Sequence, residues 1–149
     1  MADSADTEFR FAQCCLPIPD DEIKAVVHSG IGVVVHRGSC KQCDVQESQE
    51  RVLVKWAPVV NGLFSCILLV RLNNSTSAVA HSVSMLIDMK GEIEELNVQH
   101  DKGRCNLLVR VKVQSVEHLS LMIRSLNQLK VVVVAKREAR CMLLLLAQG

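Results

Sequence analysis

The chain has 149 residues, 49% of them hydrophobic and 22% charged, with 17 basic residues against 16 acidic ones. This composition excludes an intrinsically disordered chain, and a net charge of +1 excludes a large field that would drive the protein onto nucleic acid. Seven cysteines without a recognisable export signal favour the cytoplasm, where thiols or metal ligands are expected rather than disulfides. The apolar runs are too short to cross a bilayer, so no membrane segment is expected.

The first third of the chain predicts a small cysteine-rich module at residues 9–57, preceded by a disordered acidic tip at residues 1–8. Two short apolar runs, Ile23–His28 and Val33–His36, have the composition of β-strands. The turn between them, residues 29–32, contains two glycines, which provide the backbone freedom of a hairpin. We therefore expect a β-hairpin at the centre of this module.

A third strand is predicted at Val52–Trp56, and the chain then changes character. Pro58, Asn61 and Gly62 interrupt the pattern and mark a linker. The nearly continuous apolar run Leu63–Leu72 follows, as expected of a strand that is covered on both faces. The sequence therefore predicts a second domain, at residues 62–138.

Within the second domain, apolar residues from Val79 to Gly91 recur at helical spacing, with Ser75 or Ser77 as the expected N-cap. Two strands follow, at Ile93–Gln99 and Cys105–Val113, joined by a loop in which Gly103 can adopt a positive φ. In the second of these strands Leu107, Val109, Val111 and Val113 are predicted to face one way, and Asn106, Arg110 and Lys112 the other.

A second helix is predicted from Ser115, with its apolar stripe over Val116, Leu119, Ile123 and Leu126, and Val131–Val134 supplies a last strand. The order strand–helix–strand–strand–helix–strand is that of a ferredoxin-like βαββαβ domain, so the chain as a whole is α+β. Helices would cover one face of the sheet, and the other face needs a partner, either the first module or a second chain. The apolar tail at residues 139–149 is also expected to need burial.

Four residues of the first module, Cys14, Cys15, His36 and Cys40, have the composition of a metal site. His36 and Cys40 have three residues between them, so that one turn can direct both side chains inward, as in many zinc half-sites. Thiolates and a neutral imidazole suit a closed tetrahedral zinc ion. Such a site would stabilise a module that is too small to rely on its hydrophobic core.

Two alternatives to this ligand set are open. Adjacent side chains on an extended strand point to opposite faces, so Cys14 and Cys15 can share an ion only where the chain bends. Cys43 forms a competing C-x-x-C pair with Cys40. In the alternative without metal, Cys14 or Cys15 fills a gap in the apolar core, and His36 and Cys43 lie on the surface. The remaining cysteines are expected to be buried core thiols: Cys66, Cys105 and Cys141.

The stretch Phe9–Ile23, FRFAQCCLPIPDDEI, closely resembles the cysteine-rich zinc-finger module of RelA/SpoT-type (p)ppGpp synthetase/hydrolases. The family motif, A-x-C-C-x-P-[IV]-P-G-D-x-I, continues to V-H-R-x-x-C, which is found here at Val35–Cys40. Asp20 stands where the family has Gly, and Ser39 stands where it usually has Asp. The family then ends in an ACT domain, which has the fold expected for residues 62–138.

The resemblance implies a regulatory function. In the family these two domains sense the state of the ribosome and tRNA during the stringent response, transmit it to the catalytic half and contribute to self-association, here through the uncovered sheet face. The catalytic domains of the family would lie outside this sequence, so the chain is expected to catalyse nothing by itself. A zinc-fixed module could present Lys24, His28, Arg37 and Lys41 together to RNA phosphates or a partner.

Two other functions stay open from the sequence. ACT domains commonly bind a small effector such as an amino acid at a D-x-x-G junction between their first strand and helix. Here that junction is Asn74-Ser75-Thr76-Ser77, which lacks both the acid and the Gly. An amino-acid sensor is therefore one alternative, and a thiol redox switch that uses the cysteines of the first module is the other.

Overall fold

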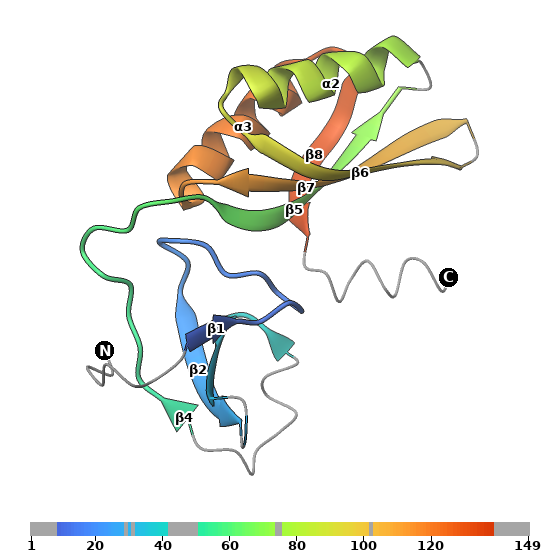
Figure 1. Ribbon diagram of the computed structural model, residues 1–149. Helices are drawn as coiled ribbons and strands as arrows, with labels where there is room; N and C mark the ends of the chain where they lie inside the picture. Colours follow the sequence, from blue (N-terminus) through green and yellow to red (C-terminus); the bar gives the residue numbers. More distant parts are fainter. Residues whose placement is uncertain are drawn as a thin grey trace.

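A computed structural model describes residues 9–28, 30, 32–41, 51–73, 76–101 and 103–138 (Figure 1). The expected tip at residues 1–8 and the apolar tail at 139–149, with Cys141, lie outside this range. The described chain forms two four-stranded sheets, and the second carries two helices. None of the helices in the described part is long and apolar enough to cross a membrane.

The first sheet contains β1 (Phe9–Phe11), β2 (Ile23–His28), β3 (Gly32–Arg37) and β4 (Arg51–Val52), in the order β1-β3-β2-β4. Strands β2 and β3 form the predicted antiparallel hairpin, with Val26 opposite Val34. Gly30 (φ 81°) and Gly32 (φ 110°) adopt the positive φ for which the turn needs glycine. Strand β1 runs parallel to β3 and was not predicted.

The predicted strand Val52–Trp56 is wrong in its extent, because pairing ends at Val52. The chain then leaves the sheet, and the indole Nε1–H of Trp56 donates a hydrogen bond to the carbonyl oxygen of Asp21 at 2.9 Å. The Trp56 ring stacks on Phe11 with centroids 5.6 Å apart, and Phe64 meets both rings edge-on. Side-chain packing at this aromatic junction therefore overrides the local strand propensity.

The second sheet contains β5 (Phe64–Leu72), β6 (Glu92–Asp101), β7 (Arg104–Val113) and β8 (Val132–Glu138), in the order β6-β7-β5-β8. Helix α2 (Thr76–Asp88) follows β5, and α3 (Val116–Gln128) follows β7. All three pairings are antiparallel. This arrangement confirms the predicted ferredoxin-like βαββαβ fold and the α+β class.

Both helices cover the same face of the second sheet, and the core lies between them and the strands (Figure 1). Strand β7 alternates as predicted, with Leu107, Val109, Val111 and Val113 fully buried. From the helices, Leu86 of α2 and Met122 of α3 are also fully buried. Cys66 and Cys105 belong to this core, as the sequence predicted.

The helix ends follow the local sequence. Ser115 caps α3, its hydroxyl accepting the N–H of His118 at 3.3 Å. Ser77, one of the two expected caps of α2, is instead the second residue of that helix, whereas Ser75 lies outside the described residues. Helix α2 is followed, two residues after Asp88, by a left-handed residue, Lys90 (φ 68°), at a position where glycine is the usual choice.

Candidate metal centre

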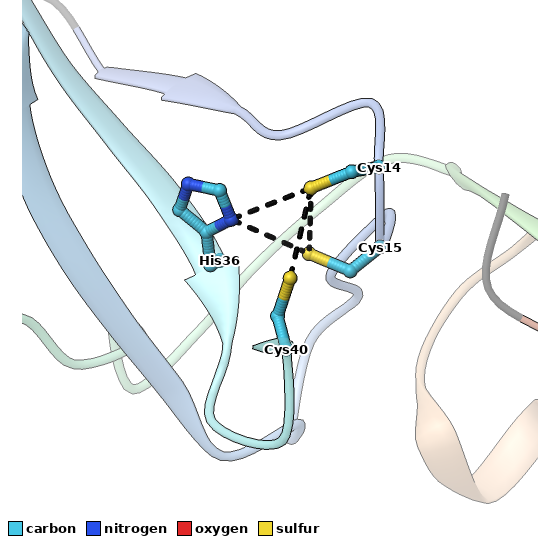
Figure 2. Close-up of side chains that lie close together, drawn as sticks. All are labelled: Cys14, Cys15, His36 and Cys40. Atoms are coloured by element: carbon cyan, nitrogen blue, oxygen red, sulfur yellow. Dashed lines mark hydrogen bonds between the residues drawn. The ribbon is translucent and has the colours of Figure 1, made fainter. Parts of the chain in front are cut away.

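His36 and Cys40 are brought to one point by the end of β3 and the turn after it. The backbone N–H of Cys40 donates to the carbonyl oxygen of Arg37 at 2.9 Å, which reverses the chain directly after the strand. This tight turn returns the Cys40 thiol to the side of the sheet on which the His36 imidazole lies (Figure 2). The three-residue spacing therefore acts as the sequence predicted.

Cys14 and Cys15 lie in a turn and not on an extended strand. The N–H of Leu16 donates to the carbonyl oxygen of Ala12 at 3.0 Å, and Leu16 has a φ of 47°. This single helix-like turn removes the alternation of an extended chain, so both thiols point the same way, with their sulfurs 3.9 Å apart. The condition under which the doublet could share an ion is thus met.

The four side chains converge, and their ligand atoms all lie within 4.8 Å of one another. The Cys14 Sγ lies 3.6 Å from the Cys40 Sγ and 3.5 Å from the His36 Nδ1, and the Cys15 Sγ lies 3.8 Å from the same nitrogen. Around a tetrahedral zinc ion, ordinary bond lengths place two sulfurs about 3.8 Å apart and a sulfur and a nitrogen about 3.6 Å apart. The donor set and its spacing therefore fit a tetrahedral metal ion.

The electrostatics of the cluster also suit a metal. Burial lowers the pKa of His36, and His28 and Lys24 act in the same direction, which favours the neutral imidazole that a metal ligand needs. Burial raises the pKa of the Cys15 thiol, and the Cys14 and Cys40 thiols add to this effect. A divalent cation would reverse it by stabilising the thiolates.

One further contact to the cluster was not predicted. The backbone N–H of Arg37 donates to the Cys15 Sγ at 3.3 Å, and this donor opposes the effect of burial by lowering the thiol pKa. Hydrogen bonds of this kind orient metal ligands. The sequence carries no signal for it, because the donor is a main-chain group that any residue at this position would supply.

The residues predicted to contact RNA or a partner do not all lie together. Lys24 lies directly opposite His36 across the hairpin. His28 is four residues after Lys24 on the same strand, so both side chains lie on the face of the sheet that carries the cluster. Lys41 is exposed and directly follows Cys40. Arg37 points to the opposite face, where its Nε lies 3.9 Å from the Asp21 carboxylate.

The remaining predicted site residues fall largely outside the described structure. Cys43, the alternative ligand, is among the residues not described. So are Asn74 and Ser75 of the effector junction, whereas Thr76 and Ser77 form the first residues of α2. The amino-acid site therefore stays a prediction at these four positions.

Comparisons with known proteins agree with this arrangement. Residues 2–57 match the RelA/SpoT RIS domain, and residues 61–137 match the ACT domain. The chain is 28% identical over 131 residues to the bifunctional (p)ppGpp synthase/hydrolase SpoT of Escherichia coli K12, covering 86% of this chain and 19% of that protein. It is 32% identical over 101 residues to the GTP pyrophosphokinase of Streptomyces coelicolor, covering 66% of this chain and 12% of that one.

A solved structure, the ACT domain from the GTP pyrophosphokinase of Chlorobium tepidum, aligns with 52% of this chain and all of its own, at a TM-score of 0.47 and 10% identity. The chain spans about a fifth of the length of the SpoT protein that it matches. The two matched domains are those of the regulatory C-terminal region of such enzymes. The chain belongs to the RelA/SpoT family, as a RIS domain followed by an ACT domain.

Proposed function

We propose that this chain is a non-catalytic regulatory region of a RelA/SpoT-type (p)ppGpp synthetase/hydrolase, and that it acts in the cytoplasm by contact. Its partners would be the ribosome and tRNA, the catalytic part of the enzyme, or a second copy. The observation that carries the proposal is the Cys/His cluster in a RIS domain that is followed directly by an ACT domain. The 131 residues aligned with SpoT are 28% identical to it. The two functional units are proposed at residues 9–57 and 62–138.

The same proposal assigns one structural zinc ion to Cys14, Cys15, His36 and Cys40. Three thiolates and one imidazole fill the four positions of a tetrahedral ion and leave none for a water or a substrate. When bound, zinc would supply a cross-link between the turn at Ala12–Leu16 and the end of β3. The role of these residues is thus to fix the shape of the RIS domain.

The proposed contact surface lies on the cluster side of the first sheet. Lys24 and His28 share that face with His36, and Lys41 follows the last ligand. Positive groups held in fixed positions are suited to phosphate oxygens. Arg37 is assigned a different role, because its guanidinium lies near Asp21 on the other face.

Co-sedimentation of the zinc-loaded chain with ribosomes carrying uncharged tRNA tests the contact function. We expect the wild type to bind, and the double change Lys24→Glu and Lys41→Glu to weaken binding roughly tenfold, with a shallower dependence on salt. The double change Arg124→Glu and Lys130→Glu, two exposed charge reversals on the ACT domain, is the matched control and should bind normally. Equal binding by all three proteins would contradict the proposed surface.

A calorimetric titration with branched-chain amino acids separates this function from the sensor alternative. The contact function predicts no heat at micromolar concentrations. Micromolar binding without ribosome association would instead favour an ACT-type amino-acid sensor.

A further inference from the structure

The segment between the second cysteine and the first hairpin strand, Leu16–Asp21, lies against the ACT domain, and we call it the docking segment. Its Ile18 side chain is fully buried and belongs to the ACT core, although it comes from the RIS domain. The carbonyl oxygen of Pro19 accepts the N–H of Val116 at 3.0 Å. Val116 is the first residue of α3, so this bond satisfies a helix N–H that has no partner within the helix.

A largely shielded ion pair fixes the end of the docking segment to the last strand of the ACT sheet. Both terminal nitrogens of Arg137, on β8, donate to the two carboxylate oxygens of Asp21 at 2.7 Å. Arg137 also donates to the carbonyl oxygen of Leu16 at 2.9 Å. The side chains of Arg137 and Asp21 are only 12% and 9% exposed. A bidentate arginine–carboxylate pair fixes the relative orientation of its two side chains, and breaking it is costly where water has little access.

The same segment is continuous with the metal cluster. Leu16, whose carbonyl Arg137 holds, directly follows the ligand Cys15, and its positive φ belongs to the turn that aligns the two thiols. Asp21 closes the segment on itself, since its carboxylate accepts the N–H of Ile18 at 2.8 Å. Arg37 touches both sites, because its N–H bonds to the Cys15 sulfur and its guanidinium lies near Asp21.

We infer that metal binding to the cluster and docking of the RIS domain on the ACT domain are one linked equilibrium, with Leu16–Asp21 as the coupling element. This inference rests on the proposed metal site and goes beyond it. A metal that fixes the Ala12–Leu16 turn also fixes the positions of the Leu16 carbonyl and the Asp21 carboxylate, which are the two groups that accept hydrogen bonds from Arg137. Because linkage is reciprocal, Arg137 must strengthen metal binding to the extent that the metal strengthens docking.

The first arm of the test measures the zinc affinity of the full chain by competition with a chromophoric chelator. We expect Arg137→Met to weaken zinc binding by about tenfold. Lys136→Met is the matched control, since Lys136 neighbours Arg137 on β8 and its half-exposed side chain places the ammonium 3.2 Å from the Glu138 carboxylate and not at the docking segment. Loss of a positive charge by itself should strengthen the binding of a divalent cation. Weaker zinc binding by Arg137→Met would therefore result from the lost hydrogen bonds to Asp21 and Leu16 and not from the lost charge.

The second arm needs no variant and measures amide hydrogen exchange in the wild type with zinc and with a chelator. We expect zinc removal to speed exchange at the Val116 N–H, which bonds to Pro19, by at least about tenfold. The Leu119 N–H, bonded within its own helix to Ser115, should be unchanged. Unchanged exchange at Val116 together with equal zinc affinities of all three proteins would overturn the coupling, whereas no zinc binding by the wild type would overturn the metal site itself.

Discussion

The two domains of this chain are stabilised by different means. The ACT domain has one continuous core that joins four strands and two helices. Among its described residues, the RIS domain has two small clusters: Ala12, Cys15 and Cys40 in one, and Ala25, Val33 and Val35 in the other. Burial on that scale does not offset the entropy of ordering some forty residues. The difference explains why the smaller domain brings three cysteines and one histidine together at one point. It also explains why Ile18 of this domain packs into the ACT core.

Loss of a metal ligand should have the largest effect, and it should fall on the RIS domain and on that domain's contacts with the ACT domain. We expect Cys40→Ser to abolish stoichiometric zinc and to remove amide protection from β2 and β3, because structural zinc contributes on the order of 10 kcal/mol to domains of this size. The ACT strands should keep their protection, apart from the contacts of the docking segment. Elemental analysis and hydrogen exchange measure both effects.

The matched control for that change is Cys66→Ser, which alters a buried thiol of the ACT core. This variant should keep its zinc and lose stability in the ACT domain. Equal zinc contents in the two variants would contradict the assignment of Cys40 as a ligand.

A cavity in the ACT core should have the second-largest effect. Leu68 is fully buried on the central strand β5, and Leu68→Ala should lower the free energy of unfolding of the ACT domain by about 3 kcal/mol. Zinc content should not change, since the docking segment still has its partners. Denaturant unfolding followed by ACT helicity checks this, and a loss below about 1 kcal/mol would argue against a rigid core.

Alkaline pH should lower the free energy of unfolding of the ACT domain, because the buried Cys66 thiol resists losing its proton. Burial raises the pKa of this thiol from 9.0 to about 12, so between these values the folded state keeps a proton that the unfolded state loses. The contribution of the protonated Cys66 thiol to the free energy of unfolding is fully present below pH 9. It falls as the pH rises toward 12, on the order of 1 kcal/mol per pH unit. Cys66→Ala should remove this part of the pH dependence, and identical slopes of the two proteins between pH 9 and 10.5 would contradict it.

The smallest effects concern left-handed residues, of which each domain has one that can be compared. Lys90→Gly should stabilise the ACT domain by about 1 kcal/mol, because Lys90 caps α2 with a φ of 68°. Asp20→Gly, at a φ of 77° in the RIS domain, should gain less, about 0.5 kcal/mol, since aspartate tolerates this region better than lysine. Thermal unfolding of the zinc-loaded proteins measures both, and destabilisation by either variant would contradict the assigned strain.

Much of the fold follows from local pattern. The alternation of β7, the stripe of α3 and the glycines of the hairpin each depend on neighbouring residues, and the sequence predicts them correctly. The convergence of Cys14, Cys15, His36 and Cys40 was also predictable, because a hairpin brings the two half-sites together. Asp20, which replaces a family glycine, keeps the left-handed turn that the glycine would provide.

The unpredicted features depend on contacts between distant parts of the chain. Asp21 and Arg137 form an ion pair across 116 residues, and neither has a sequence neighbour that indicates the other. The same is true of Trp56, whose indole N–H donates to the carbonyl oxygen of a residue 35 positions earlier in the chain. Charge and propensity describe what a residue can do, whereas its partner is decided by how the domains pack.

The central claim is that four side chains bind one tetrahedral metal ion. Titration of the metal-free chain with cobalt(II) tests it most directly, because the visible absorption spectrum of bound cobalt depends on its coordination geometry. The account predicts one cobalt per chain, with the intense visible bands of a tetrahedral site and thiolate charge-transfer absorption, both abolished by zinc and absent in Cys40→Ser. Weak octahedral absorption that is the same in the wild type and in Cys40→Ser would contradict it.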